Sequence, residues 1–282
     1  VAQLDAIANT LGARTPELAL ANKIVDKIAY EDEYHDAIRA KLKVDKKDKY
    51  NIVSVKDYAK KAVSTINDYS KKDIIAVVYA QGEISGGEGD VNVIGEGSIK
   101  RSLEEARKDD DVKAIVLRVN SPGGSALTSE LIWREIEITK KTKPVVVSMG
   151  NYAASGGYYI AANADRIFAE PNTITGSIGV FGMLPNASQL AKNIGINAEQ
   201  VKTHANAGGY SVFEPIDENF KGIVLEGIEK TYNIFLKRVA DGRKMTTEQV
   251  NEIAQGRVWT GTDAHRLGLV DEIGGLEDAI KY

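Results

Sequence analysis

The sequence predicts an α/β domain with a mainly parallel sheet, preceded by an N-terminal helical arm. From Ile74 onward, short apolar runs typical of strands buried on both faces alternate with amphipathic helical stretches. Two of these strands end in loops that contain a glycine pair and lead into a helix. The 282 residues are 43% hydrophobic and 27% charged, which is an ordinary globular composition with enough apolar residues for a full core.

The helical arm is predicted over residues 1–72. Thr15 followed by Pro16 predicts an N-cap and first helical residue, with the helix continuing through Ile28. A second, charged helix is predicted from Glu31 to about Lys43, and the basic segment 41–49 that follows it is predicted to be a solvated linker. We therefore place the domain boundary between residues 72 and 73, with the α/β domain over 73–282.

The α/β domain is predicted to alternate strands and helices along its length. In order, we expect a strand at 74–79, a helix at 97–108, a strand at 114–119, a helix at 126–140, a strand at 144–149, a helix after Ser155, a short strand at 165–169 and a long amphipathic helix at 219–241. His204 is expected in a further strand and His265 in a late helical segment.

Composition excludes several classes of protein. A net charge of −4 with both signs interspersed argues against a nucleic-acid-binding surface, so no nucleic-acid partner is expected. The chain has no cysteine, which excludes disulfides, a cysteine nucleophile and thiolate metal sites. It contains no phosphate-binding loop, metal-ligand cluster or long apolar run, so we expect a soluble chain that needs no cofactor.

Ser155 is the first candidate catalytic residue. It follows a nearly continuous apolar strand and falls at the start of a predicted helix, where free backbone N–H groups and the helix dipole favour negative charge. A serine nucleophile would suit this position. On this segment alone, Ala-Ser-Gly-Gly is equally compatible with a tight turn that lets helix and strand pack closely.

The glycine loops favour the catalytic interpretation. Gly123 and Gly124 follow one strand, and Gly156 follows Ser155 at the end of another. Loops at the carboxyl ends of parallel strands can converge on one crevice, and glycine leaves backbone N–H groups unobstructed. Such donors stabilise a developing oxyanion. The sequence thus predicts acyl-transfer chemistry with these three glycines as the oxyanion hole.

No general base can be identified from these patterns. The three histidines are His35, His204 and His265, and none has a recognisable Ser-His-Asp context. A lysine acts as a base when burial lowers its pKa towards neutrality, but no single lysine stands out.

Four motifs together resemble the signal peptide peptidase A (protease IV) family. They are Asn120-Ser121-Pro122-Gly123-Gly124, Ala153-Ala154-Ser155-Gly156-Gly157-Tyr158-Tyr159, Thr175-Gly176-Ser177-Ile178-Gly179-Val180, and Arg257-Val258-Trp259-Thr260-Gly261 with Gly268-Leu269-Val270-Asp271. The resemblance implies a crotonase/Clp-protease-like spiral of repeated β-β-α units, a Ser/Lys dyad and cleavage of signal peptides. It implies that Ser155 is the nucleophile and that Ser177 positions the lysine amine, although Ser177 could instead cap a turn.

The resemblance does not extend to the general base of the dyad. Short members of this family carry the lysine in a Gly-x-Tyr-Lys pattern, whereas this chain has Ser211 after Gly208-Gly209-Tyr210. In long, duplicated members the N-terminal half provides the lysine and the C-terminal half the serine. We therefore expect this chain to be such a C-terminal half, with no base of its own, weak or inactive alone, and partnered by the N-terminal half. Lys202 is a less favoured, displaced base.

The family also implies peptide substrates, homo-oligomers that are tetrameric in the full-length form, and a place on the periplasmic side of a bacterial inner membrane, through an anchor not included in this chain. Two other functions stay open. One is an acyl-CoA-processing enzyme on the related crotonase fold, whose chemistry does not require Ser155. The other is a non-catalytic half that only builds an assembly.

Overall fold

The chain divides into two units. The computed structural model describes residues 2–45, 50, 73–204 and 207–282. One unit holds the described residues of Val1–Tyr69 together with Leu184–Phe220, and the other holds those of Ser70–Met183 together with Lys221–Tyr282. The predicted boundary between residues 72 and 73 borders residues 51–72, which lie outside the described part, as do residues 46–49 of the predicted linker. That boundary stays a prediction.

The first unit contains four short helices within its described residues. They are α1 (Ala2–Asn9), α2 (Pro16–Ala21), α3 (Glu31–Leu42) and α8 (Ser188–Asn193). As predicted, the Thr15 hydroxyl caps α2 by accepting a hydrogen bond from Leu18 N at 3.3 Å, and α3 occupies the range expected for the charged helix.

Two predictions for this unit are wrong. Helix α2 ends at Ala21 instead of continuing through Ile28, because Lys23 adopts a positive φ of 58° that ends the helical path. Residues 201–204 form no strand, although apolar and β-branched residues favoured one there. His204 instead pairs with Asp5, with 2.9 Å between Nε2 and Oδ1.

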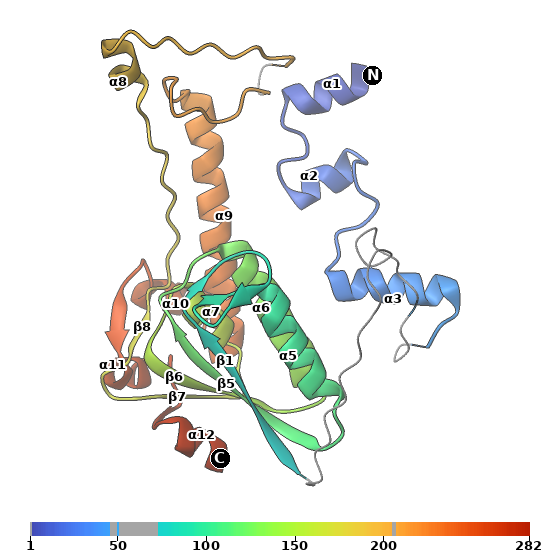
Figure 1. Cartoon of the computed structure of the whole chain (residues 1–282), viewed down its shortest axis with the longest axis vertical. Coiled ribbons are helices and arrows are strands. Elements are labelled where there is room, and N and C mark those ends of the chain that lie inside the picture. Colours follow the sequence, from blue (N-terminus) through green and yellow to red (C-terminus); the bar gives the residue numbers. More distant parts are fainter. Residues whose placement is uncertain (1, 46–49, 51–72, 205–206) are drawn as a thin grey trace. The chain divides into compact units, whose positions relative to one another are not determined.

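The second unit is built on a mainly parallel sheet, which confirms the predicted α/β class (Figure 1). Its strands are β1 (Ile74–Gln81), β5 (Val112–Ser121), β6 (Val145–Ala154), β7 (Arg166–Ala169) and β10 (Glu272–Ile273), in that spatial order and parallel throughout. β8 (Ile174–Gly176) pairs in parallel with the end of β6, and β9 (Val258–Thr260) runs antiparallel to β8. A second small sheet has the order β2 (Glu83–Ile84), β4 (Val93–Ile94), β3 (Gly89–Asp90).

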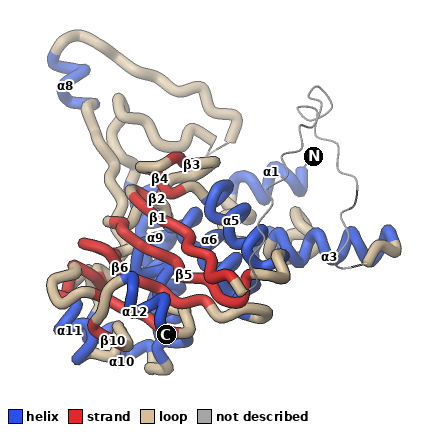
Figure 2. The backbone as a smooth tube through the Cα atoms, turned by 60° about the horizontal axis from the view of Figure 1, so that its bottom comes forward, coloured by secondary structure: helices blue, strands red, loops and turns tan. Residues whose placement is uncertain are grey.

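Helices cover both faces of the larger sheet. The remaining helices are α5 (Glu96–Lys108), α6 (Ala126–Lys140), α7 (Gly156–Ala161), α9 (Glu218–Arg243), α10 (Thr247–Ile253), α11 (Gly261–Arg266) and α12 (Leu276–Lys281). Val116, Val146 and Phe168 pack against Ala279 of α12, and α5, α6 and α7 also contact strands of the sheet. In Figure 2, α12 lies on the near side of these strands and α5 and α6 lie on the far side. Among the described residues, none of the helices combines the length and apolar character that crossing a membrane requires.

Candidate active site

The site begins where strand β6 changes its neighbour. Residues Val146 to Ser148 pair with β7, but Tyr152 to Ala154 pair with β8. Between them, the Asn120 side chain accepts hydrogen bonds from the backbone N–H groups of Asn151 (3.0 Å) and Tyr152 (3.4 Å). The strand was predicted to end at residue 149. Its continuation on a new partner brings Ser155 directly after the last strand residue.

Ser155 has an unusual backbone for a residue that is not glycine. Its φ is 53° and its ψ is −121°, a conformation that costs about 1–3 kcal/mol and that proteins tend to keep at functional sites. Two hydrogen bonds hold it: Ser155 N donates to Gly176 O (2.9 Å), and Ser155 O accepts from Tyr159 N (2.9 Å). Its half-buried hydroxyl makes no hydrogen bond with any described residue, so Oγ remains available for chemistry.

The helix that follows Ser155 is anchored on two sides. Tyr158 donates its hydroxyl proton to Leu269 O at 2.8 Å, and Tyr159 donates to Glu130 of α6. Glu130 is also bound by Arg238 of α9, whose Nε lies 3.2 Å from Oε2. Burial raises the pKa of both tyrosines, and the Glu130 carboxylate raises that of Tyr159 further, so both phenols stay neutral. Ser155 is therefore held on a rigid helix start.

The glycine loop after β5 touches Ser155. Gly123 has a φ of 103°, and a Cβ on it would come within 2.7 Å of both Ser155 Cβ and Gly156 N. Gly124 has a φ of 146°, and a Cβ there would overlap the Ile84 backbone oxygen at 2.1 Å. Only glycine fits either position.

The N–H groups of this loop differ in what they bind. Gly123 N donates to the buried hydroxyl of Ser121 at 3.1 Å. Within the described residues, the N–H groups of Gly124 and Gly156 donate to no acceptor, and Gly124 N would lie 3.3 Å from a Cβ built on Gly156. Two unused donors thus lie close together beside Ser155, in the arrangement that an oxyanion requires.

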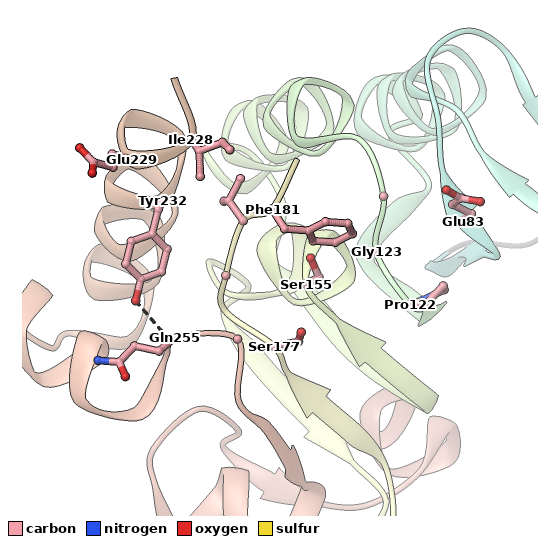
Figure 3. Close-up of a pocket in the computed structure, with 14 residues that line it drawn as sticks. Glu83, Pro122, Gly123, Ser155, Ser177, Phe181, Ile228, Glu229, Tyr232 and Gln255 are labelled. Carbon is pink, nitrogen blue, oxygen red and sulfur yellow. Dashed lines mark hydrogen bonds between the residues drawn. The ribbon is translucent and has the colours of Figure 1, made fainter. Parts of the chain in front are cut away.

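Ser177 lies next to Ser155 because of strand register. Ala154 of β6 pairs with Gly176 of β8, so the two serines follow paired residues of neighbouring strands. Ser177 also has a positive φ, 47°, and its N–H donates to Arg257 O at 2.7 Å. Figure 3 shows both serines at one cavity.

This cavity measures about 890 Å³. Its lining residues are Glu83, Pro122, Gly123, Gly124, Ser155, Ser177, Gly179, Val180, Phe181, Ile228, Glu229, Tyr232, Gln255 and Gly256. They include four of the five predicted site residues, and the fifth, Gly156, follows Ser155 in the chain. The lining drawn from the described part of the chain contains neither a lysine nor a histidine.

Several of the other candidate bases, and Ser211 at the expected lysine position, have contacts of their own. His35 contacts Tyr50 and Glu31, and His265 has its Nδ1 3.2 Å from Val270 O. The Ser211 hydroxyl accepts a hydrogen bond from Phe213 N at 3.2 Å. His265 belongs to the same unit as the cavity but is not among its lining residues, whereas His35, Lys202, His204 and Ser211 belong to the other unit.

Several lining residues were not predicted from the sequence. Phe181 follows the Ser177 motif, and its ring is close to Ser155 in the view of Figure 3. Tyr232 and Glu229 come from α9, where the sequence had shown only an apolar stripe that includes Ile228. No sequence pattern distinguished Phe181, because single apolar residues on a protein surface are common.

Comparisons with known proteins identify relatives of this chain. The profile of Peptidase family S49 matches residues 137–282, slightly more than half of the chain. A protein named Protease 4 from Haemophilus influenzae is 45% identical over 82% of this chain and 38% of its own length, and one from Salmonella typhi is 39% identical over 96% and 43%. Among solved structures, a ClpP1 variant from Listeria monocytogenes matches with a TM-score of 0.49 and 18% identity, covering 72% of this chain and 94% of that one. The chain therefore spans about two fifths of the length of these two Protease 4 relatives.

Proposed function

Since the chain belongs to peptidase family S49, we propose that it carries the nucleophile of a serine peptidase that works by a Ser/Lys dyad. The observation that supports this most directly is Ser155. It has a positive φ, a hydroxyl without a hydrogen-bond partner among the described residues, and two unused N–H donors beside it.

In the proposed reaction, a neutral lysine amine takes the proton from Ser155 Oγ, which attacks the carbonyl carbon of the substrate. The N–H groups of Gly124 and Gly156 stabilise the resulting oxyanion. Gly123 shapes the loop, and its N–H donates a hydrogen bond to the Ser121 hydroxyl. The lysine then protonates the leaving amine, and water hydrolyses the acyl-enzyme. Ser177 accepts a hydrogen bond from the amine and so orients it.

We place that lysine outside this chain, in the N-terminal half of a longer duplicated protein. Two observations support this. The described lining of the cavity offers no lysine, and Ser211 stands where the family pattern has one. The relatives named Protease 4 are more than twice as long as the segment matched here.

The biological setting is part of the same proposal. We propose cleaved signal peptides as substrates, because the cavity walls are largely apolar. The long protein would be a homo-oligomer, a tetramer when complete. It would act on the periplasmic side of a bacterial inner membrane, held by an anchor outside this chain.

Turnover of an apolar peptide amide tests the proposal. The full-length protein should be active and this chain alone weak or inactive. Ser155→Ala should lower full-length activity on the order of 10⁴-fold or more, because the covalent step is lost. Ser98→Ala, on α5 and outside the cavity lining, should change nothing. Unchanged turnover in Ser155→Ala would contradict the proposal, and robust activity of this chain alone would place the base within it.

A further inference from the structure

The cavity beside Ser155 carries charge of one sign. Its lining includes two acidic side chains, Glu83 and Glu229, and no lysine, arginine or histidine among the described residues. Both are exposed, and neither forms an ion pair or a hydrogen bond through its carboxylate with any described residue. Elsewhere in this unit, the exposed Glu88 and the half-buried Glu104 are each paired with a nearby cation. The two cavity carboxylates are available to a ligand.

The two carboxylates lie at opposite ends of the cavity. Glu83 opens β2, and the next residue, Ile84, holds the glycine loop through hydrogen bonds with Gly123 O and Ser125 N, both 2.8 Å long. Glu229 lies on α9, next to Ile228. Figure 3 shows Ser155 between the two glutamates.

The surface between the glutamates is apolar and exposed. Phe181 is 83% exposed, and Val180 and Ile228 extend the same wall. Burial of apolar area is favourable by about 25 cal/mol per Å², so an extended segment with apolar side chains would gain free energy by covering this wall. Cations at the two ends of that segment would then meet the carboxylates.

We propose that the cavity selects peptides in which an apolar stretch is flanked by cationic groups, with Glu83 binding the cation at one end and Glu229 the cation at the other. This rests on the proposed function, since the bound stretch is the one presented to Ser155. Exposed ion pairs are weak, so each cation should tighten binding about threefold, and added salt should reduce the effect.

Binding to the full-length protein carrying Ser155→Ala tests the proposal without turnover. The probes are fluorescent peptides with blocked termini and a short core of alternating leucine and alanine. Lysine or glutamine is placed at the first end, the second end or both ends. Fluorescence anisotropy should rank the double-lysine peptide tightest, each single-lysine peptide about threefold weaker and the neutral peptide weakest.

Charge-neutral variants assign each end. Glu83→Gln should abolish the lysine preference at one end and keep it at the other, and Glu229→Gln should do the reverse. The matched control is Glu252→Gln, an exposed acid of the same unit that is not among the lining residues, and it should keep both preferences. Equal binding of the neutral and lysine peptides would overturn the proposal, as would preferences that survive in both variants.

The two proposals fail in different ways. If the full-length protein cleaves neutral and lysine-flanked peptides equally well and needs Ser155 to do so, the charge selection is wrong and the peptidase proposal stands. If binding shows the charge preference but cleavage does not depend on Ser155, the peptidase proposal is wrong instead.

Discussion

Two connections of the same kind, from β5 to α6 and from β6 to α7, use their serine hydroxyls in opposite ways. In the first, every hydroxyl serves the fold. Ser121 accepts from Gly123 N, Ser125 accepts from Thr128 N as the cap of α6, and Ser129 donates to Ser125 O. In the second, the Ser155 hydroxyl bonds to no described residue. The comparison teaches that a candidate nucleophile can be recognised by a hydroxyl that makes no hydrogen bond within the fold.

The backbones of the two connections differ as well. The first places its positive φ angles on Gly123 and Gly124, which adopt them without a Cβ penalty. The second places a positive φ on Ser155 itself, where the strain must be offset by surrounding packing. The helix after Ser155 supplies that packing, because all six of its residues are buried. One connection has a relaxed backbone, and the other has a strained backbone at Ser155.

The largest effect on Ser155 reactivity, apart from replacing Ser155 itself, should come from Gly124→Ala. A Cβ at this position overlaps Ile84 O and requires an unfavourable φ, so the loop must move and its N–H donor must leave the site. We expect peptidase activity of the full-length protein to fall about 10²- to 10³-fold, the usual cost of losing one oxyanion donor. Circular dichroism should confirm that the variant is folded. A folded variant with normal activity would remove Gly124 from the site.

A smaller effect on kcat should distinguish Ser121 from Ser125, the two serines that flank the glycine pair after β5. Ser121→Ala leaves the buried N–H of Gly123 without its acceptor, and we expect about 1–3 kcal/mol of lost stability and roughly tenfold lower kcat with little change in KM. Ser125→Ala removes the cap of α6 and should cost about 1 kcal/mol of stability with kcat unchanged. Equal losses of kcat in the two variants would mean that the loop acts through stability alone.

The smallest effect on reactivity is expected at an ion pair that stabilises the same unit. Asp271 binds Arg243, with Nη2 and Oδ1 2.5 Å apart, and accepts a hydrogen bond from Ile167 N at 2.8 Å. Burial alone would raise the pKa of Asp271, but Arg243 and the Ile167 N–H lower it on balance. Because the folded pKa is depressed, the stabilisation is complete above the unfolded pKa of about 3.9 and is lost as the pH falls through the folded value.

Asp271→Asn should therefore lower the melting temperature at neutral pH, by an amount equivalent to about 3 kcal/mol if the buried Arg243 is left unpaired. The melting temperature should also become less sensitive to acid below about pH 4. Thermal melts across this pH range provide the measurement, and the rate of Ser155 labelling at a temperature where the protein is folded provides the control. A change in that rate would show that Ser155 depends on this distant pair.

Much of the sheet and part of the site could be predicted from local patterns. Apolar runs and helical periodicity located β1, β5, α5, α6 and α9 within a few residues, because each element buries a regular stripe or face. The glycine pair Gly123-Gly124 and Ser155 were predicted from their places after two strands. The structure brings these residues to one cavity, because parallel strands bring their carboxyl ends to one edge of the sheet.

Features that depend on tertiary pairing could not be predicted. Strand β6 continues past residue 149 because it pairs there with β8 instead of β7. No local sequence pattern predicts this change of partner. The engagement of Gly123 N by Ser121 appears only when the loop is folded. Phe181 and Glu229 reach the cavity from segments whose sequence patterns describe only their own elements. Helix α2 was predicted too long because the apolar residues after Ala21 continue the helical pattern, whereas the positive φ of Lys23 cannot be read from the sequence.

The central claim is that Ser155, alone among these serines, is the nucleophile. The most direct test treats the full-length protein with a fluorophosphonate and locates the adduct by peptide mass spectrometry. Our account predicts one adduct, on Ser155, with Ser121, Ser125 and Ser177 unmodified and no labelling in Ser155→Ala. An adduct on another serine, or an active protein that is never labelled at Ser155, would contradict it.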